Sequence, residues 1–164
     1  MKKLYIIGGT MGVGKTTVCN ILKKRLDMSV MLDGDWCWDI NPFIVNSCTK
    51  KLVLDNICYM LNNFIGCNEI ENIIFCWVLH NQEIIDTILS RINLSDCEII
   101  NISLVCDQKN LIKRLEKDIL SGKRNNDIID RSVNRLACYS SLKTLKIDTS
   151  NINEYQTAEI ISTL

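Results

Sequence analysis

The sequence predicts a three-layer α/β fold in which a five-stranded parallel sheet is flanked by helices. Five short apolar segments rich in β-forming residues alternate with segments of helical periodicity. Two of these segments are almost continuously apolar, as parallel strands buried on both faces are. A glycine-rich segment also joins the first strand to the first helix. The strands are expected at 4–7, 29–35, 72–79, 98–107 and 144–149, and the helices at 16–26, 46–64, 83–92, 108–120, 128–142 and 153–164.

Length and composition indicate a single domain over residues 1–164, with 47% hydrophobic residues to form its core. Lys+Arg and Asp+Glu both count 19, so no basic field indicates a nucleic-acid partner. The nine cysteines lack a C-x-x-C pair and lie mostly in apolar runs, as reduced thiols do. We see neither a signal peptide nor a membrane span. We therefore expect a cytoplasmic monomer or homodimer without a membrane partner.

The segment from Gly9 to Thr16 is G-T-M-G-V-G-K-T, which matches the phosphate-binding pattern G-x-x-x-x-G-K-[ST]. It lies between a strand and a helix, as this motif requires. Backbone N–H groups of such a loop point at phosphate oxygens, and the following helix adds its positive end. We expect nucleotide phosphates to bind at Gly9, Thr10, Met11, Gly12, Val13, Gly14, Lys15, Thr16 and Thr17.

Four polar side chains near this loop have distinct expected roles. Lys15 should meet the β- and γ-phosphates as a catalytic positive charge, and the Thr16 hydroxyl should bind the Mg²⁺ that bridges them. The second strand ends in L-D-G-D at residues 32–35. We assign Asp33 to Mg²⁺ through water. Asp35 is either the group that takes the proton of an acceptor hydroxyl or a turn residue.

Taken together, these features resemble the small P-loop kinases of the nucleoside monophosphate kinase, shikimate kinase and gluconate kinase group, over almost the whole chain. The loop G-T-M-G-V-G-K-T-T is the most specific match, and L-D-G-D is similar to the D-x-D of gluconate, shikimate and adenylylsulfate kinases. The resemblance implies a P-loop NTPase fold that uses ATP and Mg²⁺. In C-D-Q-K-N-L-I-K-R-L it implies that Arg114 packs against adenine. In the final D-T-S-N it implies an adenine loop at Asp148, Thr149 and Ser150.

The segment R-N-N-D-I-I-D-R-S-V-N-R-L-A-C-Y is similar in spacing to the lid of adenylate kinases. The similarity implies a lid whose arginines stabilise the transferring phosphoryl group. The lid here, at about 121–127, is short, which excludes a long lid of the adenylate kinase type. Arg124 and Arg135 are the first choices for this role, and Arg131 is the next. Alternatively, these arginines form a solvated helix face. Asn126 stands where the adenylate kinase pattern has an aspartate.

We expect a phosphotransferase that moves the γ-phosphoryl group of ATP to a small-molecule or nucleotide acceptor. The acceptor would bind residues of about 36–68, where Trp36 and Trp38 are either pocket walls or core residues. His80 is either an acceptor contact or a helix-entry residue. The alternatives are a nucleotide-dependent switch or ATP-hydrolysing module, and an antibiotic or sugar-nucleotide phosphotransferase. L-D-G-D favours a hydroxyl acceptor, because it is closer to the pattern of sugar and acid kinases.

Overall fold

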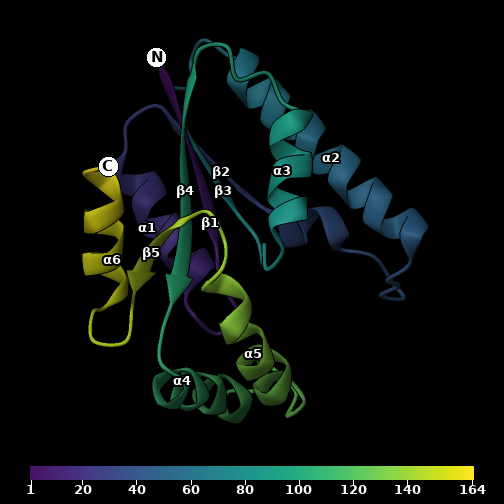
Figure 1. Ribbon diagram of the computed structural model, residues 1–164, viewed down its shortest axis with the longest axis vertical. Helices are drawn as coiled ribbons and strands as arrows, with labels where there is room; N and C mark the ends of the chain where they lie inside the picture. Colours follow the sequence, from purple (N-terminus) through teal and green to yellow (C-terminus); the bar gives the residue numbers. More distant parts are fainter.

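The computed structural model describes residues 1–164 as a parallel sheet with the strand order β2-β3-β1-β4-β5. Every neighbouring pair of strands is parallel. Figure 1 shows the strands side by side, with helices on both faces. The predicted fold class is therefore confirmed. The strands are β1 (Lys2–Gly8), β2 (Ser29–Asp33), β3 (Asn72–Cys76), β4 (Cys97–Val105) and β5 (Leu145–Asp148).

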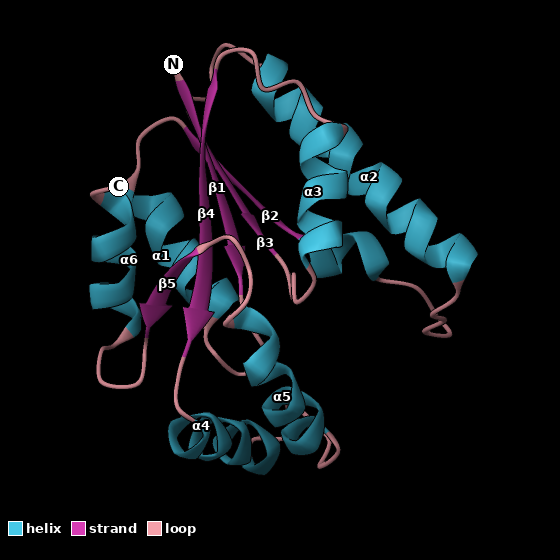
Figure 2. Ribbon diagram, in the orientation of Figure 1, coloured by secondary structure: helices cyan, strands magenta, loops and turns pink.

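The helices form the outer layers (Figure 2). Helices α1 and α6 lie against one face of the sheet, and α2 and α3 lie against the other, while α4 and α5 lie near the carboxyl ends of β1 and β4. No helix combines the length and the apolar character that a membrane span needs. The helices are α1 (Lys15–Arg25), α2 (Ser47–Gly66), α3 (Gln82–Ser90), α4 (Gln108–Leu120), α5 (Ile128–Leu136) and α6 (Glu154–Ser162).

The central strand β1 separates two hydrophobic clusters. Successive side chains of a strand point to opposite faces, so Tyr5 and Ile7 join the cluster that contains α1 and α6 residues. Leu4 and Ile6 join the cluster on the α2 and α3 side. All four side chains are buried. This two-sided burial is what the continuously apolar strands predicted.

The third strand is shorter than expected, because it ends at Cys76 and not at residue 79. The chain still follows β1 for two further residues. The Trp77 amide donates to the Ile7 carbonyl, and the Gly9 amide donates to the Val78 carbonyl. Leu79 then adopts a left-handed conformation with φ of 39°. This bend carries the chain away from the sheet toward α3.

The expectation of one helix over 128–142 is wrong. Helix α5 ends at Leu136, and a short 3-10 helix, η2 (Ala137–Tyr139), follows it. The Tyr139 side chain is buried in the α2 and α3 cluster, and its hydroxyl donates to the Val78 carbonyl. The end of α5 thus coincides with the point at which an aromatic side chain enters the core.

The segment after β2 is a 3-10 helix, η1 (Gly34–Trp38), where the sequence predicted strand and loop. The Asp33 carboxylate accepts a hydrogen bond from the Asp35 amide and so caps this helix. Gly34 is buried against the indole of Trp77, and a Cβ at this position would lie 2.5 Å from the Trp77 Cγ. The close approach of Gly34 and Trp77 joins the ends of β2 and β3.

Candidate active site

The phosphate-binding loop packs tightly against its neighbours. Gly9 and Gly12 have φ values of 152° and 84°, in the region where side chains are strained. A Cβ on Gly9 would lie 2.8 Å from the Leu104 carbonyl oxygen, and a Cβ on Gly12 would lie 2.5 Å from the Leu115 Cδ2. Glycine at these positions therefore lets the loop lie directly on β4 and α4.

Helix α1 begins directly after this loop. Its N-cap is Gly14, which supplies no side-chain hydrogen bond. The first N–H groups of a helix have no partner within the helix, so those of α1 are available to an anion. The Lys15 ammonium donates to the carbonyls of Gly9 (2.8 Å) and Thr10 (3.1 Å). Burial lowers the pKa of Lys15 below its ordinary value, and the neighbouring Cys76, Asp35 and Asp33 oppose that shift.

Thr16 and Asp33 form the predicted metal-binding pair. The Thr16 hydroxyl donates to the Asp33 Oδ2 at 2.8 Å, and the Asp33 residue is only 6% exposed. A hydroxyl and a carboxylate are the oxygen ligands that Mg²⁺ takes, with phosphate oxygens and water completing its shell. No cluster of three or more His, Cys, Asp or Glu side chains exists that would hold a metal by itself. The pair therefore fits Mg²⁺ bound together with a nucleotide.

Asp35 lies at the same edge of the sheet and accepts a hydrogen bond from the Trp77 Nε1 at 3.1 Å. Loss of hydration and the Asp33 charge raise the pKa of Asp35, while Lys15, the Trp77 hydrogen bond and Arg124 act in the opposite direction. The other oxygen of Asp35, Oδ2, has no protein partner. Asp35 is therefore a held carboxylate with one oxygen left to accept a proton.

Sequence reasoning missed Trp77. It follows Cys76, which pairs with Asp33 in the sheet register, so Trp77 comes beside Gly34 and Asp35. Only the pairing of β2 with β3 creates this contact, and no local sequence pattern predicts that pairing. The sequence offered one signal for Trp77 itself, an indole N–H donor close to the end of a strand.

The two tryptophans of η1 have different environments. Trp38 is half-buried and packs against the rings of Trp77 (6.1 Å between centroids) and Phe43 (5.9 Å). Its Nε1 donates to the Ile44 carbonyl. Trp36 is 57% exposed and makes no such ring contact. Trp38 is thus a packed residue, whereas the Trp36 ring faces solvent.

His80 is half-buried in the segment after β3. Its Nδ1 atom is buried and has no hydrogen-bond partner. Burial and the nearby Arg135 charge lower the pKa of His80. The imidazole is therefore neutral at neutral pH.

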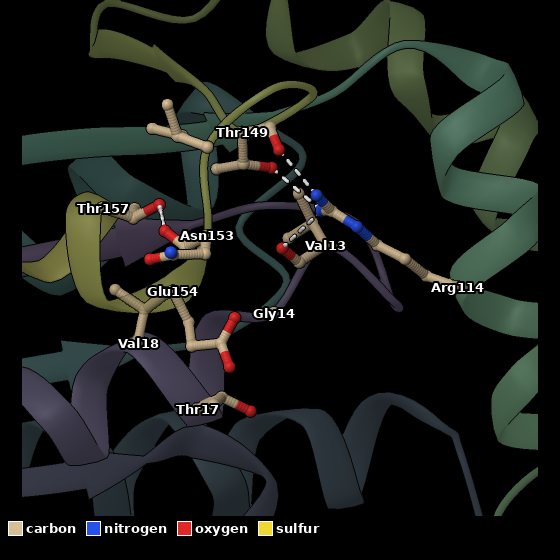
Figure 3. Close-up of a pocket in the computed structure, with 10 residues that line it drawn as sticks. Val13, Gly14, Thr17, Val18, Arg114, Thr149, Asn153, Glu154 and Thr157 are labelled. Atoms are coloured by element: carbon tan, nitrogen blue, oxygen red, sulfur yellow. Dashed lines mark hydrogen bonds between the residues drawn. The ribbon is translucent and has the colours of Figure 1, made fainter.

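A cavity of about 280 Å³ opens beside the phosphate-binding loop (Figure 3). Its walls come from the start of α1, from α4 and from the segment between β5 and α6. The Arg114 guanidinium donates to the Val13 carbonyl, the Thr149 hydroxyl and the Thr149 carbonyl. Arg114 is thus fixed at the cavity wall, where the resemblance implied an adenine contact. Asn153 and Glu154 also line the cavity, and the sequence analysis did not select them.

Asp148 and Ser150 shape the loop that lines this cavity. The Asp148 carboxylate accepts from the Ser150 amide (2.8 Å) and hydroxyl (2.6 Å). The Ser150 hydroxyl in turn accepts from the Asp107 amide. Among the three residues implied for the adenine loop, only Thr149 lines the cavity. Asp148 and Ser150 instead stabilise the conformation of the loop that carries Thr149.

The three lid and helix arginines are placed differently. Arg124 is paired with Asp118 at 3.1 Å, and Arg131 is paired with Asp127 at 3.0 Å with 56% of its side chain exposed. Arg135 points to the phosphate-binding loop, where its Nη1 lies 3.6 Å from the Met11 sulfur. Of the three, Arg135 is thus the one that already contacts the loop.

A side-chain hydrogen bond also links the phosphate-binding loop to α5. The Thr10 hydroxyl donates to the Ser132 carbonyl at 2.9 Å, and both residues are buried. A change in the position of α5 therefore acts directly on the loop that carries Lys15.

Solved structures of the same fold include several kinases. The tunicamycin resistance protein of Deinococcus radiodurans has a TM-score of 0.71 at 19% identity, covering 99% of this chain and 95% of that one. A gluconokinase from Sinorhizobium meliloti 1021 has a TM-score of 0.68 at 11% identity, over 96% and 87% of the two chains. The APS kinase of Mycobacterium tuberculosis, solved with AMPPNP and APS, has a TM-score of 0.66 at 13% identity, over 98% and 95%.

At these identities the likeness shows the fold, and it confirms the predicted resemblance to small P-loop kinases. A sequence comparison with curated proteins finds no match. A family model described as AAA domain matches residues 6–133, which include the phosphate-binding loop, Asp33 at the end of β2, Asp35 just after it and the predicted lid. Since this match covers well over half of the 164 residues, the chain belongs to that AAA domain family.

Proposed function

We propose that the protein is an ATP-dependent phosphotransferase that moves the γ-phosphoryl group to a hydroxyl of a small-molecule acceptor. One observation carries this proposal. The Asp35 carboxylate accepts a hydrogen bond from Trp77 and comes two residues after Asp33, which is bonded to Thr16. These residues lie at the edge of the sheet where the phosphate-binding loop begins. A protein that only binds a nucleotide has no need for a carboxylate held in this way. A hydrolysing module could use it to orient water, so the dependence of turnover on an acceptor decides between the two.

The proposed step is an in-line displacement at the γ-phosphorus. The acceptor oxygen forms a bond to the γ-phosphorus, the bond from that phosphorus to the β,γ-bridging oxygen breaks, and ADP leaves. The acceptor proton passes to the free oxygen of Asp35. Lys15 stabilises the charge that develops on the phosphate oxygens, in place of its present bonds to Gly9 and Thr10.

Thr16 and Asp33 would hold Mg²⁺, which would supply positive charge to offset that of the phosphates. The arginines Arg124, Arg131 and Arg135 would add charge from the lid side, and the position of Arg135 beside Met11 supports this role most directly. The segment of about 36–68 would bind the acceptor.

All nine cysteines are free, which supports a reducing, cytoplasmic setting.

The charges at the site favour a hydroxyl over a phosphate as the acceptor group. Loss of hydration and the nearby Asp33 charge both raise the pKa of Asp35. A phosphate acceptor would bring two more negative charges to this pair, whereas a neutral hydroxyl would not. The gluconokinase among the similar structures also supports this choice.

The test is ADP production from ATP across a panel of acceptors that includes sugars, sugar acids, nucleosides and nucleoside monophosphates. Tunicamycin and APS belong in the panel because two similar structures carry these names. We expect turnover with one hydroxyl acceptor. Lys15→Ala should abolish it, and Asp35→Asn should lower it strongly while ATP affinity stays unchanged.

Two outcomes contradict the proposal. Wild-type turnover in Asp35→Asn would remove Asp35 from the acceptor site. ADP production that needs Lys15 but is independent of every acceptor would favour the ATP-hydrolysing module, whether or not it also needs Asp35.

A further inference from the structure

Most polar groups that line the nucleotide cavity are already engaged by the protein itself. Arg114 is bonded to Val13 and Thr149. The Asn153 side-chain oxygen accepts from the Gln156 amide as the N-cap of α6, and the Thr157 hydroxyl donates to the Asn153 carbonyl. The carboxylate of Glu154, by contrast, has no hydrogen bond and no ion pair, although Glu154 lines the cavity.

Glu154 lies between the two ends of the proposed nucleotide site. In Figure 3 its carboxylate points toward Gly14 and Thr17, at the start of α1, and Arg114 lies across the cavity. The start of α1 is the phosphate end, because its backbone N–H groups are uncapped. Arg114 and Thr149 mark the opposite end. The sugar of a nucleotide lies between its phosphates and its base. Glu154 lines the same cavity as residues of both ends, so the sugar is the part of a nucleotide that its carboxylate can meet beside the phosphate end.

The chemistry of a carboxylate limits what it can bind there. An ionised carboxylate only accepts hydrogen bonds, so phosphate oxygens are excluded as partners. The donors of a nucleotide are its sugar hydroxyls and the amino group of its base. At the level of the sugar, the hydroxyls are the donors within reach.

We infer that Glu154 recognises the ribose of the nucleotide by accepting hydrogen bonds from its 2′- and 3′-hydroxyls, so that the site selects ribonucleotides over deoxyribonucleotides. This inference rests on the proposed function only in requiring that the cavity binds ATP. It is independent of the acceptor. A hydrogen bond to a charged group is worth a factor of about ten or more in affinity.

The test measures the affinities of ATP, 2′-dATP, 3′-dATP and ITP by isothermal titration calorimetry. Wild-type protein should bind ATP about tenfold or more tightly than at least one of the two deoxynucleotides. Glu154→Ala should bring ATP down to the affinity of that deoxynucleotide. Removing a negative charge also relieves repulsion of the triphosphate, but it does so for all four nucleotides. The ratio of affinities is therefore the informative quantity.

Matched variants separate the contact from a general charge effect. Glu154→Ala leaves the capping box of α6 intact, because Asn153 and Gln156 form it. Glu159→Gln removes a carboxylate from the same helix, where it pairs with Arg25 outside the cavity. This control should keep the full preference for ATP. Glu154→Gln should show an intermediate preference, because its amide oxygen still accepts.

The results that overturn the inference are distinct from those that overturn the proposed function. Equal affinity of wild-type protein for ATP and both deoxynucleotides removes ribose recognition but leaves ATP binding in place. A Glu154→Ala effect that appears in the comparison of ATP with ITP, and not with the deoxynucleotides, assigns Glu154 to the base amino group. If wild-type protein fails to bind ATP at all, the proposed function and this inference both fall.

Discussion

Gly34→Ala tests whether Gly34 is required only because Trp77 covers it. The added Cβ would lie 2.5 Å from the Trp77 Cγ and 2.7 Å from its Cδ1, distances at which one of the two groups has to move. The backbone of Gly34 is outside the positive-φ region, so alanine causes no dihedral strain there. The entire cost should therefore come from the collision with the indole.

The expected magnitude follows from overpacking, which costs about 1–3 kcal/mol. For a domain of this size that loss corresponds to a fall in melting temperature of roughly 2–12 °C, at about 2–4 °C per kcal/mol. If the indole moves, its hydrogen bond to Asp35 and its contact with Trp38 are also lost. Gly66→Ala is the control, because a Cβ there meets nothing within 4 Å. It should be neutral or slightly stabilising.

The assay is a double-mutant cycle in urea, followed by circular dichroism. In a Trp77→Ala background the obstacle is gone, so Gly34→Ala should cost almost nothing or even stabilise the fold. The coupling free energy should then equal the cost seen in wild type, about 1–3 kcal/mol. An equal cost of Gly34→Ala in both backgrounds would refute the steric explanation.

Three further predictions use separate measurements. Lys15→Ala should lower phosphoryl transfer by a factor on the order of 10² to 10³ in a protein that still folds, and transfer within a few-fold of wild type would contradict the role of Lys15. Arg124→Ala should lower turnover while its exposed pair with Asp118 contributes less than about 1 kcal/mol to stability, so a large fall in melting temperature would indicate a structural role. Hydrogen bonds from Lys51 and Arg91 lower the pKa of Asp55 in the folded state. The stabilisation from Asp55 should therefore be complete above the unfolded pKa of about 3.9 and vanish as pH falls through the folded pKa. The urea midpoints of wild type and Asp55→Asn should converge in acid, and a constant difference down to the lowest pH would contradict this.

The order of the strands and helices along the chain was predictable from the sequence, because each element carries its own pattern. The phosphate-binding loop is contiguous, so its residues and its position between β1 and α1 follow from the nine consecutive residues Gly9 to Thr17 and the patterns on either side. Asp33 and Asp35 were found in the same way, at the end of an apolar strand. The error at α5 arose because its helical periodicity continues beyond Leu136, whereas the helix ends where Tyr139 enters the core.

Contacts between segments far apart in the chain were decided only by the tertiary structure. The strand order β2-β3-β1-β4-β5 brings Trp77 to Asp35, 42 positions away, and the return of the chain after β5 brings Glu154 to the start of α1. Helix and strand patterns repeat over a few residues, so they report which side of an element is apolar. They carry no information about which strand becomes its neighbour or in which register. The local sequence therefore determined the glycine-rich loop and the two aspartates near the end of β2, while packing across the sheet decided which side chains surround them.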